Sequence, residues 1–118
     1  MFADPQSVTY ATVAKSLAAV GRTDTQSEYR LDDSGTVYDL TVSHQFKGRN
    51  RVVARLRRDA IVANPLNPTT NIVASATASF TVDFPSSGLT SSDAKDLGNA
   101  LVAWLTSANI LKMANGET

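Results

Sequence analysis

The sequence predicts an α+β fold: an N-terminal β-hairpin and a five-stranded antiparallel sheet, followed by one or two C-terminal helices. Two observations favour this class. Long stretches of residues 7–84 alternate between apolar and polar side chains, which is the period of a half-buried strand. From Ala94 onward, apolar residues recur every three to four positions, the period of a helix that packs on one side. With 118 residues, the chain is expected to be a single domain with a core of its own.

Short strands are expected at the start of the chain. Residues 7–13 and 15–20 are rich in β-branched and small side chains, which predicts a hairpin that closes near Ala14. Gly21 and Arg22 then interrupt the strand pattern.

The middle of the chain predicts a third short strand and then a longer hairpin. Residues 26–31 form the short strand, and a turn at 32–35 (Asp-Asp-Ser-Gly) leads into residues 36–47, which alternate strictly. Residues 48–50 predict a three-residue loop before the next strand at 51–62. This loop length sets the expected pairing across the hairpin: Lys47 with Arg51, Ser43 with Arg55, and Thr41 with Arg57.

Positive charge is concentrated in the second strand of this hairpin. Six of the eleven Lys and Arg residues lie within residues 47–58, where no acidic residue occurs, although the whole chain is formally neutral. Strand alternation puts Arg51, Arg55 and Arg57 on one face of the strand. The other face then carries Val52, Ala54 and Leu56. A basic face on a neutral protein indicates a directed surface for a polyanion.

Short hydroxyl and amide side chains share the predicted face with these arginines. The neutral members are Thr41, Ser43, Gln45, Thr77 and Ser79, with Asp39 as the one expected acidic exception. Arginine forks clamp phosphates, and small polar side chains beside them contact bases or sugars. The simpler alternative is a solvated polar face that binds nothing. Arg58 breaks the alternation: it falls on the apolar face opposite Leu40, either in a bulge or exposed at the end of the sheet.

A loop, a last strand and a helical region complete the chain. The loop is rich in proline and asparagine and comprises Asn64, Pro65, Leu66, Asn67, Pro68, Thr69, Thr70 and Asn71. A strand follows at 72–84, and Thr90–Asp93 is a helix N-cap signature for a helical region of about residues 91–114. Residues 109–113 either continue this helix or start a short second one, and Gly116 is expected to stop it.

The helical region predicts a partner subunit. Its apolar stripe, expected in a core or dimer interface, comprises Leu97, Leu101, Trp104 and Leu105. One helix of about 17 residues is only about 25 Å long and does not cover such a sheet. We therefore expect an obligate homodimer in which helices of one subunit cover the sheet of the other.

The residue inventory argues against an enzyme. The chain has no cysteine, and its only histidine, His44, falls on the apolar face, so neither a metal site nor a catalytic triad has its residues. Asp32 with Asp33 reads as a turn, and Asp93 with Asp96 as helix capping. No cofactor, metal or small-molecule substrate is expected. The N-terminus lacks the features of a signal peptide, and no apolar run is long enough for a membrane span.

Two segments give the sequence a family resemblance. YDLTVSHQFKGRNRVVARLRR (38–58) and ASFTVDFPSSGLTSSDAKDLGNALVAWLTS (78–107) resemble the central hairpin, last strand and first helix of coat proteins from single-stranded RNA bacteriophages (leviviruses). This resemblance implies an interlocked dimer, a small icosahedral shell, single-stranded RNA on the inner face of the sheet, and assembly of the virion in the bacterial cytoplasm. It also implies translational repression through an RNA hairpin.

The resemblance assigns roles to named residues. The implied RNA-binding positions are Thr41, Ser43, Gln45, Lys47, Arg49, Arg51, Val53, Arg55, Arg57, Ser75, Thr77 and Ser79, with Arg49 in the turn. The 64–71 loop is implied to gather at the symmetry axes, as a contact between dimers. A dimeric RNA-binding regulator that does not assemble is the main alternative. A small-molecule-binding or enzymatic domain is a third, with little support from the residues.

Overall fold

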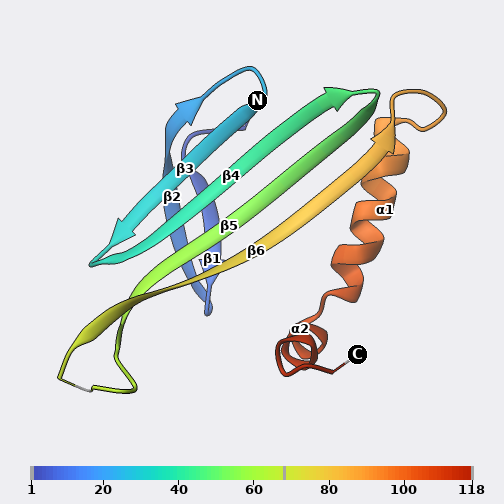
Figure 1. Ribbon diagram of the computed structural model, residues 1–118. Helices are drawn as coiled ribbons and strands as arrows, with labels where there is room; N and C mark the ends of the chain where they lie inside the picture. The colour runs from blue at the N-terminus through green and yellow to red at the C-terminus, as the bar shows by residue number, and fades with distance from the viewer. Residues whose placement is uncertain (1, 68, 118) are drawn as a thin grey trace.

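Residues 2–67 and 69–117 are described by a computed structural model, so Pro68 of the predicted loop lies outside the described residues. The chain forms one antiparallel sheet whose six strands lie in sequence order, followed by two helices (Figure 1). The predicted fold class is confirmed, because β1 and β2 form the hairpin and β2 to β6 form the five-stranded sheet. The bounds are β1 (Gln6–Tyr10), β2 (Val13–Arg22), β3 (Gln26–Asp33), β4 (Thr36–Lys47), β5 (Arg49–Ala63), β6 (Asn71–Pro85), α1 (Ser91–Trp104) and α2 (Ser107–Ala114).

The N-terminal hairpin closes earlier than expected. Ala11 and Thr12 form its two-residue turn, with φ values of 49° and 69°, and Tyr10 pairs with Val13. The prediction of a turn near Ala14 is therefore wrong. Two-residue hairpin loops favour positive φ at both positions because that twist matches the strands.

The strand β2 serves two partners. Its first half pairs with β1, and residues 18–22 pair with β3. The expected interruption at Gly21 and Arg22 is wrong, because a bulge between Ala19 and Gly21 keeps both residues in the strand. The change of partner itself lies one step earlier, between Leu17 and Ala18.

The β4–β5 hairpin has a tighter turn than the sequence predicts. Gly48 alone connects the strands, with a φ of 68°, so Lys47 pairs with Arg49. The predicted register is therefore wrong by two residues. Because side chains alternate with a period of two, this even shift leaves every side chain on its predicted face.

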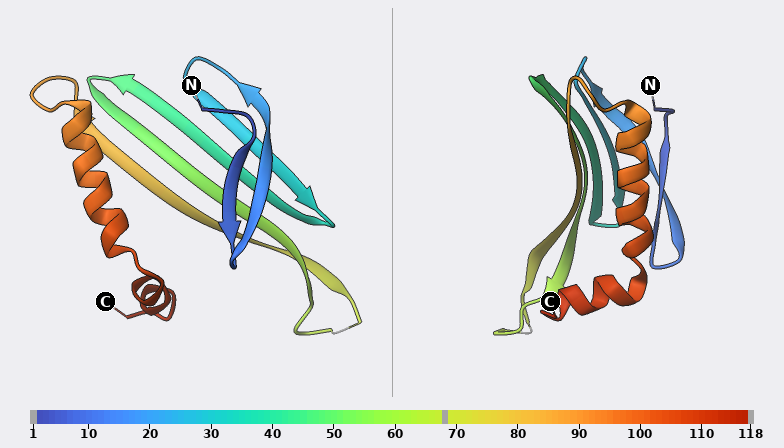
Figure 2. Two further views of the ribbon diagram at one scale, coloured as in Figure 1. Left: turned by 180° about the vertical axis from the view of Figure 1, so that it is seen from behind. Right: turned by 90° about the vertical axis from the view of Figure 1, so that its right-hand side faces the viewer.

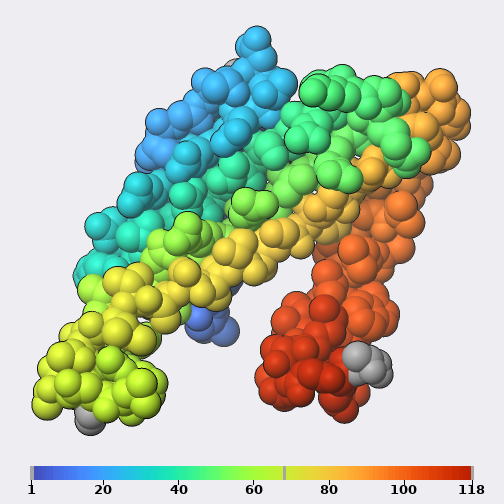
Figure 3. All heavy atoms as spheres, in the orientation of Figure 1, coloured from blue at the N-terminus to red at the C-terminus, as the bar shows by residue number. Residues whose placement is uncertain are grey.

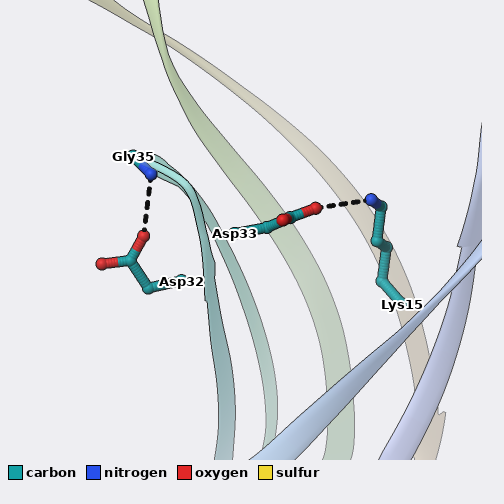
Figure 4. Close-up of polar contacts among 4 residues, drawn as sticks. All are labelled: Lys15, Asp32, Asp33 and Gly35. Atoms are coloured by element: carbon teal, nitrogen blue, oxygen red, sulfur yellow. Dashed lines mark hydrogen bonds and ion pairs between the residues drawn. The ribbon is translucent and has the colours of Figure 1, made fainter.

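The core of the single chain lies under the N-terminal hairpin. Leu17 from β2 and Tyr29 and Tyr38 from the sheet are buried against each other. At the border of this core, Lys15 of β2 forms an ion pair with Asp33 at 2.6 Å (Figure 4). Asp32 braces the adjacent β3–β4 turn by accepting a hydrogen bond from the Gly35 backbone N–H (Figure 4).

The predicted helix start is confirmed. Thr90 and Asp93 exchange backbone and side-chain hydrogen bonds in a capping box at the start of α1. The open question at residues 109–113 is resolved in favour of a second helix, capped by Thr106. Helix α1 meets its own sheet at Gly98, where an added Cβ atom would lie 3.0 Å from the ring of Phe80.

Most of the helical surface remains uncovered. Figure 2 shows the helices on the same side of the sheet as the N-terminal hairpin, and Figure 1 shows them beyond the β6 edge. The radius of gyration is 17.1 Å, against about 13 Å for a compact chain of this length. The accessible surface is 8588 Å², and a compact monomer of this mass exposes about 6,200 Å². The excess is about 2,400 Å².

Candidate nucleic-acid interface

The pleat of the sheet gathers the predicted polar residues on one face. Register places Arg55 between Thr41 and Ser79, and Arg57 between Asp39 and Thr77. The predicted residues that share this polar face are Thr41, Ser43, Gln45, Lys47, Arg49, Arg51, Val53, Arg55, Arg57, Ser75, Thr77 and Ser79. Figure 3 views this face, which neither the N-terminal hairpin nor the helices cover.

Arg49 is the one member whose predicted element is wrong. The sequence suggested a turn residue, but Arg49 is the first residue of β5, opposite Lys47. The cause is the one-residue turn at Gly48, which brings Arg49 into the ladder and onto the polar face.

Ion pairs divide the cations of this face into two groups. Asp83 binds Arg49 (Nε to Oδ1, 3.0 Å) and lies 3.6 Å from a terminal nitrogen of Arg51. Asp59 binds Arg57 (Nε to Oδ1, 2.9 Å). In the described part of the chain, Arg55 forms no ion pair, and two hydroxyl residues flank it across the strands. Arg55 is therefore a cation with free donors at the centre of the face.

The polar face holds more acid than expected. Asp39 is not the one exception: Asp59, Asp83 and Glu28 lie on the same face. Strand parity already placed Asp83 there, since it is four residues from Ser79. The sequence alone did not place Glu28 on this face, because its side depends on how β3 pairs with β4.

Glu28 and Asp39 form a pair of neighbouring carboxyl groups at the β3 side of this face. Glu28 pairs with Thr41, which puts it diagonally beside Asp39. The Oδ1 atom of Asp39 is buried and has no hydrogen-bond partner among the described residues. A hydrogen bond to the Asp39 carboxyl, followed by its charge, raises the pKa of Glu28 above its ordinary value, while nearby Arg30 opposes the shift.

Glu28→Gln is expected to stabilise the fold at pH 7 and to lose that advantage in acid. The folded state holds the Glu28 proton more tightly than the unfolded state, so the wild-type chain loses stability as pH rises from the ordinary pKa through the raised one. Denaturant unfolding at about pH 3 and about pH 7 would measure the difference, because these two values lie below and above the ordinary carboxyl pKa of about 4. Asp24→Asn, at an exposed carboxylate with no ion pair among the described residues, is the control; equal effects of both substitutions at both pH values would contradict the expectation.

Arg58 occupies neither of its expected environments. The ladder is unbroken at this position, where Arg58 pairs with Tyr38 rather than Leu40, and the side chain is half-buried. Its guanidinium stacks over the Tyr10 ring, 4.7 Å from the centroid. The N-terminal hairpin supplies this aromatic surface, so an isolated strand pattern had no means of revealing it.

Other candidate chemistry is sparse. His44 lies on the apolar face, stacked with Phe46 at a ring-centroid separation of 5.9 Å. Within residues 2–67 and 69–117, no three His, Cys, Asp or Glu side chains are grouped as metal ligands. None of the helices in the described ranges is long and apolar enough to cross a membrane.

Comparison with known proteins gives a family and a fold. The family described as "Phage phiCb5, coat protein" matches residues 3–83, more than half of the chain. The virus-like particle of bacteriophage AVE019 is similar in structure (TM-score 0.79, 17% identity, covering 100% of this chain and 98% of that one). The virus-like particle of Beihai levi-like virus 21 is also similar (TM-score 0.74, 15% identity, covering 94% of this chain and 91% of that one). So is the bacteriophage EMS014 coat protein (TM-score 0.69, 20% identity, covering 87% of this chain and 73% of that one). No curated protein matches the chain.

Proposed function

The chain belongs to the phage phiCb5 coat protein family, and we propose that it dimerises, assembles into a small icosahedral shell and packages single-stranded RNA against the polar face of its sheet. The observation that carries this proposal is the contrast between the two faces. One is polar and open, with Arg55, unpaired within the described residues, at its centre, and the other is apolar and covered only in part by its own chain. On this proposal the protein is a structural component of the virion, assembled in the bacterial cytoplasm, and not an enzyme.

Dimerisation is supported by the uncovered apolar surface. Obligate dimers bury about 1,000 Å² or more per subunit, within the excess of about 2,400 Å². Grooves of about 410 and 440 Å³ flank the contact between α1 and β6. Leu97, Leu101 and Trp104 are 68%, 46% and 54% exposed, whereas Leu105 is half-buried. A partner that packs against this stripe would remove it from water.

RNA binding is supported by the free donors of the polar face. Arg55, between Thr41 and Ser79, can hold a phosphate with its guanidinium while a hydroxyl on either side reaches sugar or base. Phosphate binding of this kind weakens with salt, by about 0.7 in log slope per phosphate neutralised on a single strand. Repression of translation through one RNA hairpin would be a further use of the same face.

The 64–71 loop is proposed as the contact between dimers. Beyond Asp59, β5 and β6 pair only with each other, so this loop ends a projecting two-stranded arm (Figure 3). Asn64 braces the loop by accepting from the Leu66 N–H (2.9 Å) and by donating its own N–H to the Thr70 carbonyl (3.0 Å). Leu66 is 94% exposed, so its apolar side chain is available for a contact with another dimer.

Leu66→Asp is expected to leave dimers intact and to lower the yield of particles about tenfold or more, because the charge would be buried between dimers without a partner. Sedimentation velocity separates dimers from particles. Leu66→Met, which keeps an apolar side chain, is the control and should assemble normally. Normal assembly of the aspartate variant would exclude Leu66 from the contact between dimers.

Expression of the chain alone tests the proposed function. Electron microscopy should show uniform particles, and their ultraviolet spectrum should carry excess absorbance from nucleic acid. Free dimers that bind RNA but form no particles would favour the non-assembling regulator instead. Particles without nucleic acid would contradict the RNA-binding part of the proposal.

A further inference from the structure

Arg58 is a half-buried cation on the apolar face of the sheet that lacks a counter-ion. No carboxylate of the described residues lies within ion-pair distance of it. Its Nε atom is buried and has no hydrogen-bond partner in the same part of the chain. A buried N–H donor without a partner is costly, so the single chain leaves this site incomplete.

Two tyrosines hold the guanidinium in place, and its Nε atom has no partner in the described part of the chain. The Arg58 guanidinium lies 4.7 Å from the ring centroid of Tyr10 and 6.0 Å from that of Tyr38. Stacking over Tyr10 engages the flat face of the guanidinium and leaves the Nε–H free for an anion. The other cation nearby, Lys15, is already paired with Asp33 at 2.6 Å. The site therefore keeps a net positive charge.

The side chain of Arg58 borders an apolar groove of about 220 Å³. Tyr10, Tyr38 and Leu56 line it together with Ala76 and Ala78 of β6, which are both exposed. Small side chains at the floor allow the backbone of a helix to approach the sheet closely. The strands β5 and β6 run between the N-terminal hairpin and α1 on this side of the sheet (Figure 2, left).

The helices of a second copy are the segments that a dimer would bring to this groove. The helices α1 and α2 lie on the same side of the sheet as the groove but beyond the β6 edge (Figures 1 and 2). A two-fold axis at that edge would therefore place the two helices of each subunit over the sheet of the other. Helix α2 buries none of its residues in its own chain, and Ile110 and Leu111 are 51% and 62% exposed.

Charge selects one end of α2. The C-terminal end of a helix carries partial negative charge, and Glu117 lies just beyond it, tied to the last turn by its N–H on the Lys112 carbonyl at 3.0 Å. The acids of α1 are already engaged: Asp93 caps the helix, and Asp96 lies 3.8 Å from Lys95. Glu117 has no ion pair among the described residues.

We propose that the groove beside Arg58 receives the C-terminal end of α2 from a second copy of the chain, and that Arg58 pairs with Glu117 of the partner subunit. This inference rests on the proposed dimer and adds a defined ionic contact to it. It gives the unpartnered Nε donor of Arg58 an acceptor and covers the exposed alanines of β6.

Cysteine cross-linking tests the contact directly, because the chain has no cysteine of its own. Two differently tagged chains, one with Arg58→Cys and one with Glu117→Cys, are co-expressed, and the dimer fraction is oxidised. A covalent heterodimer should appear on a non-reducing gel. Arg58→Cys combined with Lys95→Cys, at the far end of the helical region, is the matched control and should cross-link at least about tenfold less. Equal yields from both pairs, or no covalent heterodimer, would overturn the proposal.

Charge exchange gives a second readout that needs no cross-link. Arg58→Glu is expected to raise the dimer dissociation constant at least about tenfold. The double variant Arg58→Glu with Glu117→Arg should recover most of that loss, measured by sedimentation over a concentration series. A double variant as weak as Arg58→Glu would refute the pairing. A wild-type chain that sediments as a monomer would instead refute the proposed dimer itself.

Discussion

Leu101→Asp is expected to abolish the folded dimer. Leu101 lies on the stripe of α1 that its own sheet leaves 46% exposed, and it lines one of the grooves beside β6. In the proposed dimer the new carboxylate would be buried without a partner, at a cost of about 3 kcal/mol or more. The two-fold axis repeats that cost in the second subunit. Size-exclusion chromatography and circular dichroism should report monomer with reduced secondary structure.

Ala103→Asp provides the matched control for this experiment. At about 100° per residue, position 103 lies on the opposite side of α1 from position 101, so the same charge should stay in water there. The control should dimerise like the wild type. If Leu101→Asp also dimerises with wild-type stability, the exposed stripe is not the dimer interface.

Arg55→Ala is expected to cause the largest loss of RNA among single substitutions on the polar face. Arg55 has no ion pair in the described part of the chain, so all of its donors are available to phosphate. Loss of a charge-assisted bidentate contact should weaken RNA binding about tenfold. The salt dependence of binding should also become shallower by about 0.7 in log slope for each phosphate contact removed. Binding of single-stranded RNA to purified dimers over a salt series would measure both effects.

Arg57→Ala is the control, because Arg57 lies two residues away on the same face but is held by Asp59 at 2.9 Å. Its donors are partly used within the chain, so its loss should weaken RNA binding less than the loss of Arg55. If both variants lose the same RNA affinity, the ion pair with Asp59 does not reduce the contribution of Arg57 to RNA binding. No loss from either variant, with dimers intact, would exclude the polar face as the RNA-binding surface.

The faces of the central hairpin were predictable although its register was not. Parity placed Thr41 and Arg55 on one side and Leu56 on the other, and the true register differs by two residues from the expected one. An even shift preserves sides, so the polar residues gathered as expected. The turn itself escaped prediction because Gly48, alone with a positive φ, closes the hairpin that the sequence pattern assigned to three residues.

The sequence by itself determined the alternation of strands, the capped start of α1 and the separation of polar from apolar side chains. These are local properties: each depends on residues a few positions apart. Only the tertiary structure decided which arginines are paired and where Arg58 lies. Arg49 meets Asp83 from 34 positions away, and Arg58 meets Tyr10 across the hairpin. Such contacts depend on the pairing of whole strands and the folding of one layer over another, which a one-dimensional pattern does not encode.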